Sequence, residues 1–230
     1  MKQDLIIVGV GATARRIYRF VKMYNLYNVI GFAVDRKYIE ENNFMELPVY
    51  ELENIKNIAQ EKNAVIFVAV FWNNLNSDRK KIYERLKKQG LNFANIISPT
   101  AIIRGNLKGN NCWINDYVIV QSDAEIGNDV FIMDTALIGN EAVVKDHVFI
   151  APAAKIGGGA TIGEQSFVGI NAIVFDDTNV GNRCIIGAGT AIKRNVSDNT
   201  VCKVSVENVI YKQYDENIIE SKLKTNHNIR

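Results

Sequence analysis

Residues 126–168 read IGNDVFIMDTALIGNEAVVKDHVFIAPAAKIGGGATIGEQSFV, and isoleucine or valine returns at every sixth position of this stretch. The spacing continues in both directions, so that every sixth residue from Ile114 to Ile192 is isoleucine or valine. Four residues after each aliphatic position comes a small or β-branched residue, and glycine often follows the aliphatic residue directly. A period of six predicts a β-helix, in which each repeat is one short strand and a turn. We expect the aliphatic residues to point into the prism and the small residues to fit its corners.

The first hundred residues lack this period and alternate apolar runs with helical patterns. Three apolar runs are typical of buried strands: 4–10, 28–35 and 64–70. Residues 14–24 and 77–90 have helical spacing, and in the second helix we expect Ser77 as the N-cap and Gly90 as the stop signal. Strands that alternate with helices predict a small Rossmann-like unit with a parallel sheet.

A glycine turn lies between the first predicted strand and the first predicted helix. Residues 9–14 have the pattern GxGxxA, and Asp35 ends the next predicted strand. Glycines let the backbone approach a phosphate closely, and the helix N-terminus supplies positive potential. A tight turn that holds no ligand is the alternative interpretation. The unit has room for little more than one mononucleotide-binding half, so a nucleotide-linked ligand fits better than NAD.

Composition excludes several classes of function. The 230 residues carry a formal net charge of +2, which is too small to indicate nucleic acid or a membrane surface as a partner. No run approaches the ~18 consecutive apolar residues of a membrane span. Asp4 in the first apolar run argues against a signal peptide. The three cysteines are scattered without CxxC spacing, so we expect them to be reduced, which suits a cytoplasmic protein.

From IIVGVGATAR through GFAVD, FVAV and the hexapeptides to IIGAGTAIKRNVSDNTV, the chain resembles a family of bacterial sugar acyltransferases. These enzymes act on nucleotide-linked amino sugars or on sialic acid. The resemblance implies a fold of α/β plus all-β type, with a small Rossmann-like βαβ domain at 1–100 and a left-handed parallel β-helix at 101–210. A polar C-terminal tail is expected at 211–230. The resemblance also implies acetyl-CoA as co-substrate, no metal, and a homotrimer.

The resemblance places the nucleotide-linked sugar on the N-terminal domain. By position, the residues on its phosphates are Gly9, Gly11, Ala12 and Thr13. Asp35 and Arg36 are expected near the base or ribose. Phe71 stands where the family usually has glycine, and it either stacks on the base or packs in the core.

Acetyl-CoA is expected along the β-helix, in a groove between neighbouring subunits. The implied lining residues are Phe149, Gly158, Ile170 and Gly187. Lys193 and Arg194 are candidates for the CoA phosphates, because charged contacts to phosphate are strong. Phe149 replaces a second histidine that is common in the family.

The family's catalytic histidine falls at Asn140, with its acidic companion at Glu141. A hydroxyl nucleophile normally requires a positioned base, whereas a neutral amine carries its own lone pair. The asparagine therefore favours N-acetylation. We expect Asn140 to orient the amine, Glu141 to take up its proton, and N–H groups near Gly157 and Gly158 to stabilise the oxyanion.

The predicted function is transfer of acetyl from acetyl-CoA to a nucleotide-linked amino sugar, of the 4-amino-4,6-dideoxy type, for surface polysaccharide or glycan. For the nucleotide we expect dTDP first, UDP second and GDP third. The alternatives are O-acetylation of a sugar or sialic acid, and a binding protein whose activity has decayed. His147, in the next repeat, is an alternative base. A γ-type carbonic anhydrase is excluded, because its zinc needs three histidines and the chain has two.

Overall fold

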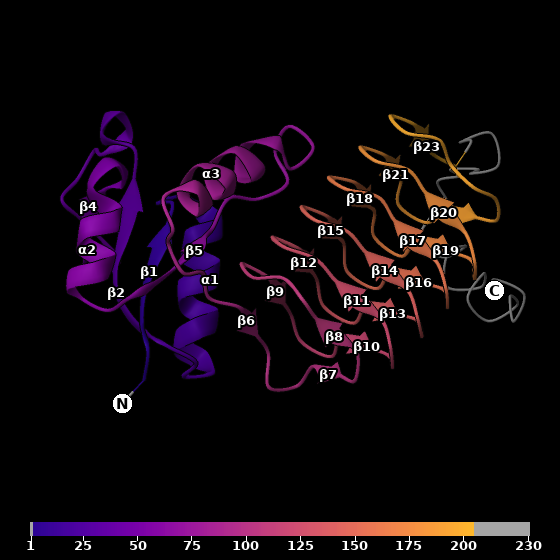
Figure 1. Cartoon of the computed structure of the whole chain (residues 1–230), viewed down its shortest axis with the longest axis horizontal. Coiled ribbons are helices and arrows are strands. Elements are labelled where there is room, and N and C mark those ends of the chain that lie inside the picture. The colour runs from indigo at the N-terminus through magenta and orange to yellow at the C-terminus, as the bar shows by residue number, and fades with distance from the viewer. Residues whose placement is uncertain (1, 205–230) are drawn as a thin grey trace, which may run out of the picture.

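The computed structural model describes residues 2–204, and two units follow one another in them (Figure 1). The first is a five-stranded sheet with helices, and the second is a three-sided prism of short parallel strands, a left-handed β-helix. The predicted fold class is therefore confirmed. The predicted boundary after residue 100 falls between β6 (Ile96–Ile97) and β7 (Ile102–Ile103), and the predicted tail lies outside the described residues. None of the helices in residues 2–204 has the length and apolarity that a membrane crossing requires.

The N-terminal sheet has the strand order β3-β4-β2-β1-β5. Its strands are β1 (Asp4–Val8), β2 (Asn28–Val34), β3 (Asn43–Phe44), β4 (Leu47–Glu51) and β5 (Val65–Val68). All neighbours pair parallel except β3 and β4, which pair antiparallel. The helices are α1 (Ala12–Met23), α2 (Ile55–Glu61) and α3 (Ser77–Lys88), with 3-10 turns η1 (Arg36–Tyr38) and η2 (Leu52–Asn54). The sequence predicted β1, β2, β5, α1 and α3. It missed β3, α2 and β4, and β4 is half-buried throughout and shows no alternation.

Helix α3 begins next to its predicted cap. The N-cap residue is Asn76, at φ 61, and Ser77 is the first helical residue, so the predicted N-cap was wrong by one position. The side-chain amide of Asn76 donates to the carbonyl of Ser166 in the prism at 3.3 Å. A contact between the two units therefore fixes the start of this helix. Gly90, at φ 77, follows the last turn as expected for a stop signal.

The prism has three faces, each a parallel sheet. The first face contains β6, β9 (Trp113–Ile114), β12 (Phe131–Ile132), β15 (Phe149–Ile150), β18 (Phe167–Val168), β21 (Ile185–Ile186) and β23 (Val201–Cys202). The second contains β7, β10 (Ile119–Val120), β13 (Leu137–Ile138), β16 (Lys155–Ile156), β19 (Ile173–Val174) and β22 (Ala191–Ile192). The third contains β8 (Asn106–Leu107), β11 (Glu125–Ile126), β14 (Val143–Val144), β17 (Thr161–Ile162) and β20 (Asn179–Val180).

The interior of the prism is the predicted aliphatic column. Every sixth residue from Ile114 to Ile192 is buried in one core cluster, together with the small residues of the corners. Each coil takes 18 residues, so that Ile132 pairs with Ile150 and Ile150 with Val168. The corners turn through left-handed backbone that recurs every six residues, from Tyr117 at φ 56 to Gly189 at φ 67. The sequence interpretation of the period is confirmed.

The outward sides of the three faces differ in chemistry. The first face presents aromatic rings, which the N-terminal unit covers: Trp113, Phe131, Phe149 and Phe167. The rings of Phe20 on α1 and Trp113 lie 6.0 Å apart, and those of Phe67 and Phe131 lie 5.8 Å apart. The second face presents aliphatic side chains to solvent, and the third is largely polar. The second face is therefore a mostly apolar surface, interrupted by Lys155, that remains exposed within residues 2–204.

Candidate functional site

The two glycines of the glycine turn have different roles. Gly9 has φ 127, its N–H donates to the carbonyl of Ala33 at 2.7 Å, and an added Cβ would lie 3.2 Å from the carbonyl oxygen of Ala69. This glycine is required by the fold. Gly11 is exposed directly before α1, and an added Cβ there would meet no atom within 4 Å. The open space beside Gly11 is available to a ligand.

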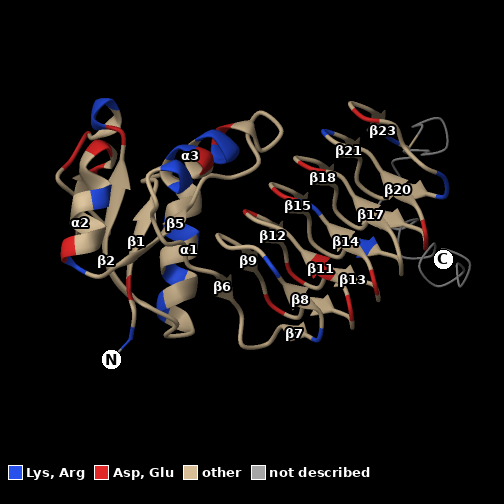
Figure 2. Ribbon diagram, in the orientation of Figure 1, with Lys and Arg blue, Asp and Glu red and all other residues tan. Residues whose placement is uncertain are grey.

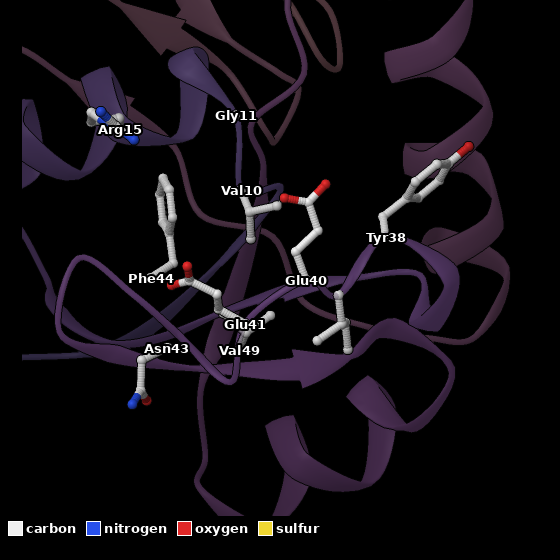
Figure 3. A pocket seen from close by; sticks show the side chains of 10 residues that line it. Val10, Gly11, Arg15, Tyr38, Glu40, Glu41, Asn43, Phe44 and Val49 are labelled. Atoms are coloured by element: carbon white, nitrogen blue, oxygen red, sulfur yellow. The ribbon is translucent and has the colours of Figure 1, made fainter.

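A cavity of about 490 Å³ lies beside Gly11 (Figure 3). Its walls come from the glycine turn, from α1 and from the segment between η1 and β4, and they include Arg15, Tyr38 and Phe44. The guanidinium of Arg15 lies 5.3 Å from the ring centre of Phe44. Helix α1 has no acid in its first turn, and Figure 2 shows several Lys or Arg positions in blue along its ribbon. The helix N-terminus, the guanidinium and the aromatic rings favour an anion that carries an aromatic group, whereas Glu40 and Glu41, which also line the cavity, oppose a negative charge.

The other predicted phosphate-binding residues, Ala12 and Thr13, open helix α1. Asp35 and Arg36 do not line the cavity beside Gly11. They line a separate hollow with Arg85, whose Nη2 lies 2.7 Å from Oδ1 of Asp35. The Nε of Arg36 lies 3.5 Å from Glu51. Asp35 and Arg36, which were expected near the base or ribose, therefore each form an ion pair within the N-terminal unit.

Phe71 lies in a third cavity, of about 570 Å³, between α1 and the first face of the prism. Its ring meets that of Phe149 edge-on, with centroids 4.9 Å apart, and the guanidinium of Arg16 lies 5.6 Å from the centre of the Phe71 ring. Ile170 also lines this cavity. The structure thus brings together one predicted sugar-binding residue and two predicted CoA-binding residues. We call this third cavity the aromatic cavity.

Asn140 and Glu141 lie at an exposed corner between the second and third faces. The backbone N–H of Asn140 donates to Oε1 of Gln121 at 3.1 Å, and its carbonyl accepts from the N–H of Gly159 at 2.8 Å. Glu141 has φ 59, one of the left-handed corner conformations. Both side chains face outward, where a second molecule can reach them.

The predicted oxyanion donors are already engaged. The N–H of Gly157 donates to Val174 at 2.8 Å within the sheet ladder, and the N–H of Gly158 donates to Oδ1 of Asp176 at 2.7 Å. The prediction that these two groups are free to stabilise an oxyanion was wrong. The prism uses the first in its ladder, and an aspartate from the next coil, which the sequence pattern did not single out, occupies the second.

The predicted CoA-binding residues fall into two groups on one chain. Phe149, Ile170 and Gly187 lie on the first face or at the corner where it meets the second. Gly158 and Lys193 lie at the Asn140 corner, on the opposite edge of the second face. The Nζ of Lys193 lies 5.5 Å from the ring centre of Phe175. A single chain does not bring the two groups into one groove.

His147 belongs to a buried polar cluster under α3, which the sequence reasoning missed. Its Nδ1 lies 2.8 Å from Oδ2 of Asp129, whose other oxygen accepts from Arg79 at 3.0 Å. Burial raises the pKa of the nearby Tyr83, so its hydroxyl stays protonated, and it donates to Asn110 at 2.7 Å. Asp129 and His147 are 18 residues apart, one coil of the prism. That spacing was the signal that could have found the pair. Within the described residues no cluster of side chains could hold a metal ion.

No protein-family model and no curated protein sequence matches the chain. Solved structures do match over both units. A histidine-to-asparagine variant of perosamine N-acetyltransferase from Caulobacter crescentus, in complex with CoA and GDP-perosamine, is 22% identical, with a TM-score of 0.76 and coverage of 91% of this chain and 97% of that one. The acetyltransferase domain of PglB from Neisseria gonorrhoeae is 23% identical, with a TM-score of 0.75 and coverage of 86% and 95%. WeeI from Acinetobacter baumannii is 17% identical, with a TM-score of 0.72 and coverage of 87% and 97%. At these identities the likeness establishes the fold.

Proposed function

We propose that this chain is an acetyl-CoA-dependent N-acetyltransferase that acts on the amino group of a nucleotide-linked amino sugar. The observation that carries the proposal is the match of both units together to perosamine N-acetyltransferase, over 91% of this chain and 97% of that one. Fold alone does not define function, so the residues of the sites must support the reaction as well. The helix N-terminus and the open space beside Gly11 support a nucleoside diphosphate in the first cavity, and the exposed prism corner carries Asn140 and Glu141.

The side chains favour an amine over a hydroxyl as the acceptor. Within residues 2–204 the one histidine is His147, which is buried beside Asp129 and away from the Asn140 corner. A hydroxyl must lose its proton during attack, and histidine is the usual base for this step. A neutral amine attacks a thioester directly once both reactants are held in position, and positioning supplies much of the rate acceleration. The side-chain carbonyl of Asn140 is proposed to orient the amine.

A homotrimer explains why the proposed site residues lie on two edges of one prism. The outward side chains of the second face are mostly aliphatic, and Ile102 and Ile173 are 45% and 37% exposed. Burial of such a face against another copy is favourable, by about 25 cal/mol per Å² of apolar surface. Packing prisms side by side would place the Asn140 corner of one chain next to the aromatic cavity of its neighbour. The acetyl-CoA groove is proposed to lie at that junction.

The nucleotide of the acceptor is proposed as a class. The Caulobacter structure holds GDP-perosamine, whereas we expect dTDP first from the resemblance. The walls of the cavity beside Gly11 combine aromatic side chains with two carboxylates, Glu40 and Glu41, and the guanidinium of Arg15. This set does not select one nucleobase. The acceptor is therefore a GDP-, UDP- or dTDP-linked amino sugar.

Ligand-induced stabilisation tests the binding half of the proposal. Acetyl-CoA and one of the amino-sugar nucleotides should each raise the melting temperature, because a ligand that binds only the folded state stabilises it. Each shift is measured with one ligand at a time, because the two ligands are proposed to meet where the acetyl group is transferred. If neither ligand shifts the melting temperature at millimolar concentration, the proposed function is wrong.

A further inference from the structure

The aromatic cavity combines two departures from the family pattern. Phe71 stands in place of a glycine and Phe149 in place of a histidine, and the two rings are in contact with centroids 4.9 Å apart. Trp72 and Phe167 extend the aromatic wall, with ring centroids 5.3 Å apart. The volume of about 570 Å³ lies within the range of roughly 300–1,000 Å³ that is usual for small-molecule sites. An apolar cavity of this size is large for an acetyl group alone.

Two polar atoms that belong to its walls have no partner. Trp113 and Asn115 both line the cavity and are 3% and 7% exposed. The indole N–H of Trp113 and Oδ1 of Asn115 make no hydrogen bond to any atom of residues 2–204. A buried polar group without a partner costs about 1–3 kcal/mol, so such groups call for an explanation. Neither atom has appreciable solvent-accessible surface, so neither faces the open cavity, and the choice of ligand rests on the rings and the charged groups of its walls.

The charged groups of the cavity have opposite signs. The positive charges are those of Arg16 and Arg19 on α1. The glycine turn before this helix borders the cavity beside Gly11. Asp134 contributes a half-buried carboxylate from the corner of the prism after β12, and its Oδ2 accepts from Nδ2 of Asn115 at 3.3 Å. Guanidinium groups bind phosphate oxygens in fork geometry, and a carboxylate binds an ammonium group.

Three classes of ligand can be compared with these walls. An alkyl chain would pack against the rings but offer no partner to Asp134, Arg16 or Arg19. A nucleobase would stack and form hydrogen bonds, but it carries no positive charge for Asp134. A deoxy-amino sugar has C–H faces and a methyl group for the rings and a basic nitrogen for Asp134. Its nucleoside diphosphate is proposed to lie in the cavity beside Gly11, which borders the same helix. Of the three classes, the sugar matches both the rings and the carboxylate.

We propose that the aromatic cavity holds the amino-sugar ring of the acceptor, and that Asp134 is a further catalytic residue, the carboxylate that accepts the proton of the acceptor amine. This inference rests on the proposed function. In the step, the amine nitrogen forms a bond to the thioester carbon, and the bond from that carbon to sulfur breaks. The proton leaves the nitrogen for Asp134 and passes from there to the CoA sulfur, so the products are the amide and free thiol and Asp134 is again ionised.

Asp134 suits this role better than Glu141. Asp134 is half-buried, is held by Asn115, and lies in the same cavity as Phe149 and Ile170, where the thioester is proposed to end. Glu141 is exposed at another corner and has no side-chain hydrogen bond within the described part of the chain. A proton acceptor must lie within hydrogen-bond reach of the nitrogen. A sugar bound in the aromatic cavity can place its amine nitrogen within hydrogen-bond reach of Asp134 of the same chain.

Activity is the first readout. Asp134→Asn keeps the size and the hydrogen bond to Asn115 but cannot accept a proton. We expect it to lower kcat by on the order of 10²–10⁴-fold, with the KM for acetyl-CoA unchanged. Asp123→Asn, an exposed corner carboxylate outside the cavity, is the matched control and should behave as the native chain. If Asp134→Asn is near normal and Glu141→Gln loses the rate, the proposal is overturned.

Binding is the second readout, and it separates this proposal from the proposed function. Calorimetry compares an amino-sugar nucleotide with the same nucleotide whose amine is replaced by hydroxyl. The native chain should bind the amine form more tightly, and Asp134→Asn should bind both equally while its affinity for the free nucleoside diphosphate stays unchanged. If Asp134→Asn keeps the full preference for the amine, Asp134 does not hold the nitrogen, whether or not the chain transfers acetyl. If the native chain binds no sugar nucleotide at all, both proposals are wrong.

Discussion

Nε of Arg79 lies 3.0 Å from Oδ1 of Asp129, and both side chains are fully buried where α3 meets the prism. The guanidinium also donates to the carbonyl of Asp129 at 3.0 Å and lies 4.0 Å from the ring centre of Phe131. His147 binds the other oxygen of the same carboxylate. The pair joins an element of the N-terminal unit to two successive coils of the prism, and so it helps to set the position of the cavity beside Gly11 relative to the prism.

Replacing Arg79 with alanine should therefore destabilise the whole chain. Removal of one partner leaves a buried charge uncompensated, which typically costs about 3–5 kcal/mol. Arg85→Ala, which removes the half-exposed partner of Asp35, should cost no more than about 1 kcal/mol. Urea denaturation of both variants measures the difference. Equal losses in the two variants would show that the buried pair does not hold the units together.

His147→Ala should lower stability and leave the chemistry intact. The side chain is 4% exposed, and its Nδ1 lies within hydrogen-bond distance of the Asp129 carboxylate in the buried cluster. We expect a lower melting temperature, with acetyl transfer close to native when it is assayed well below that temperature. A variant that is folded but has lost acetyl transfer would make His147 the catalytic base after all.

Gly11→Val should abolish nucleotide binding without unfolding the chain. The position has ordinary backbone angles, and an added Cβ meets no atom within 4 Å, so the new side chain enters the cavity only. The paired variant Gly9→Ala should lose stability instead, because φ 127 and the Ala69 carbonyl at 3.2 Å leave no place for a methyl group. Melting curves with and without the nucleotide sugar separate the two effects. Loss of acetyl-CoA binding in Gly11→Val would mean that this turn is structural.

Ile173→Glu should break the proposed trimer. The side chain stands on the outward side of the second face, and a buried carboxylate at a subunit contact carries a large desolvation cost. Asn179→Glu, on the polar third face, should leave the assembly unchanged. Sedimentation of both variants and the native chain gives the assembly state. A native chain that sediments as a monomer contradicts the trimer, and with it the groove between subunits.

The sequence predicted the prism well because one period specifies it. Every sixth residue from Ile114 to Ile192 points into the core of the prism, so one atypical residue would not change the predicted fold. The N-terminal unit was predicted in part: β4 contains Pro48 and is half-buried throughout, so neither its composition nor its alternation marks a strand.

The candidate sites were harder to predict, because they depend on contacts between units. Nothing local to residues 71 and 149 indicates that the two phenylalanines touch, since their contact depends on how the sheet docks on the first face. Asp35 fits the position of a ribose ligand, yet Arg85 from a distant helix pairs with it. Asp134 is one of many polar corner residues, and only the cavity around it distinguishes it.

The most direct test of the account is a product analysis of the native chain with acetyl-CoA and a panel of GDP-, UDP- and dTDP-linked amino sugars. Mass spectrometry of the products and release of free CoA thiol are measured together. The account predicts that at least one amino-sugar nucleotide gains a single acetyl group as an amide on its amino nitrogen, with one CoA released per product. The matching sugar with hydroxyl in place of the amine should remain unchanged. Acetyl found on a sugar oxygen, or no transfer to any acceptor that binds, would contradict it.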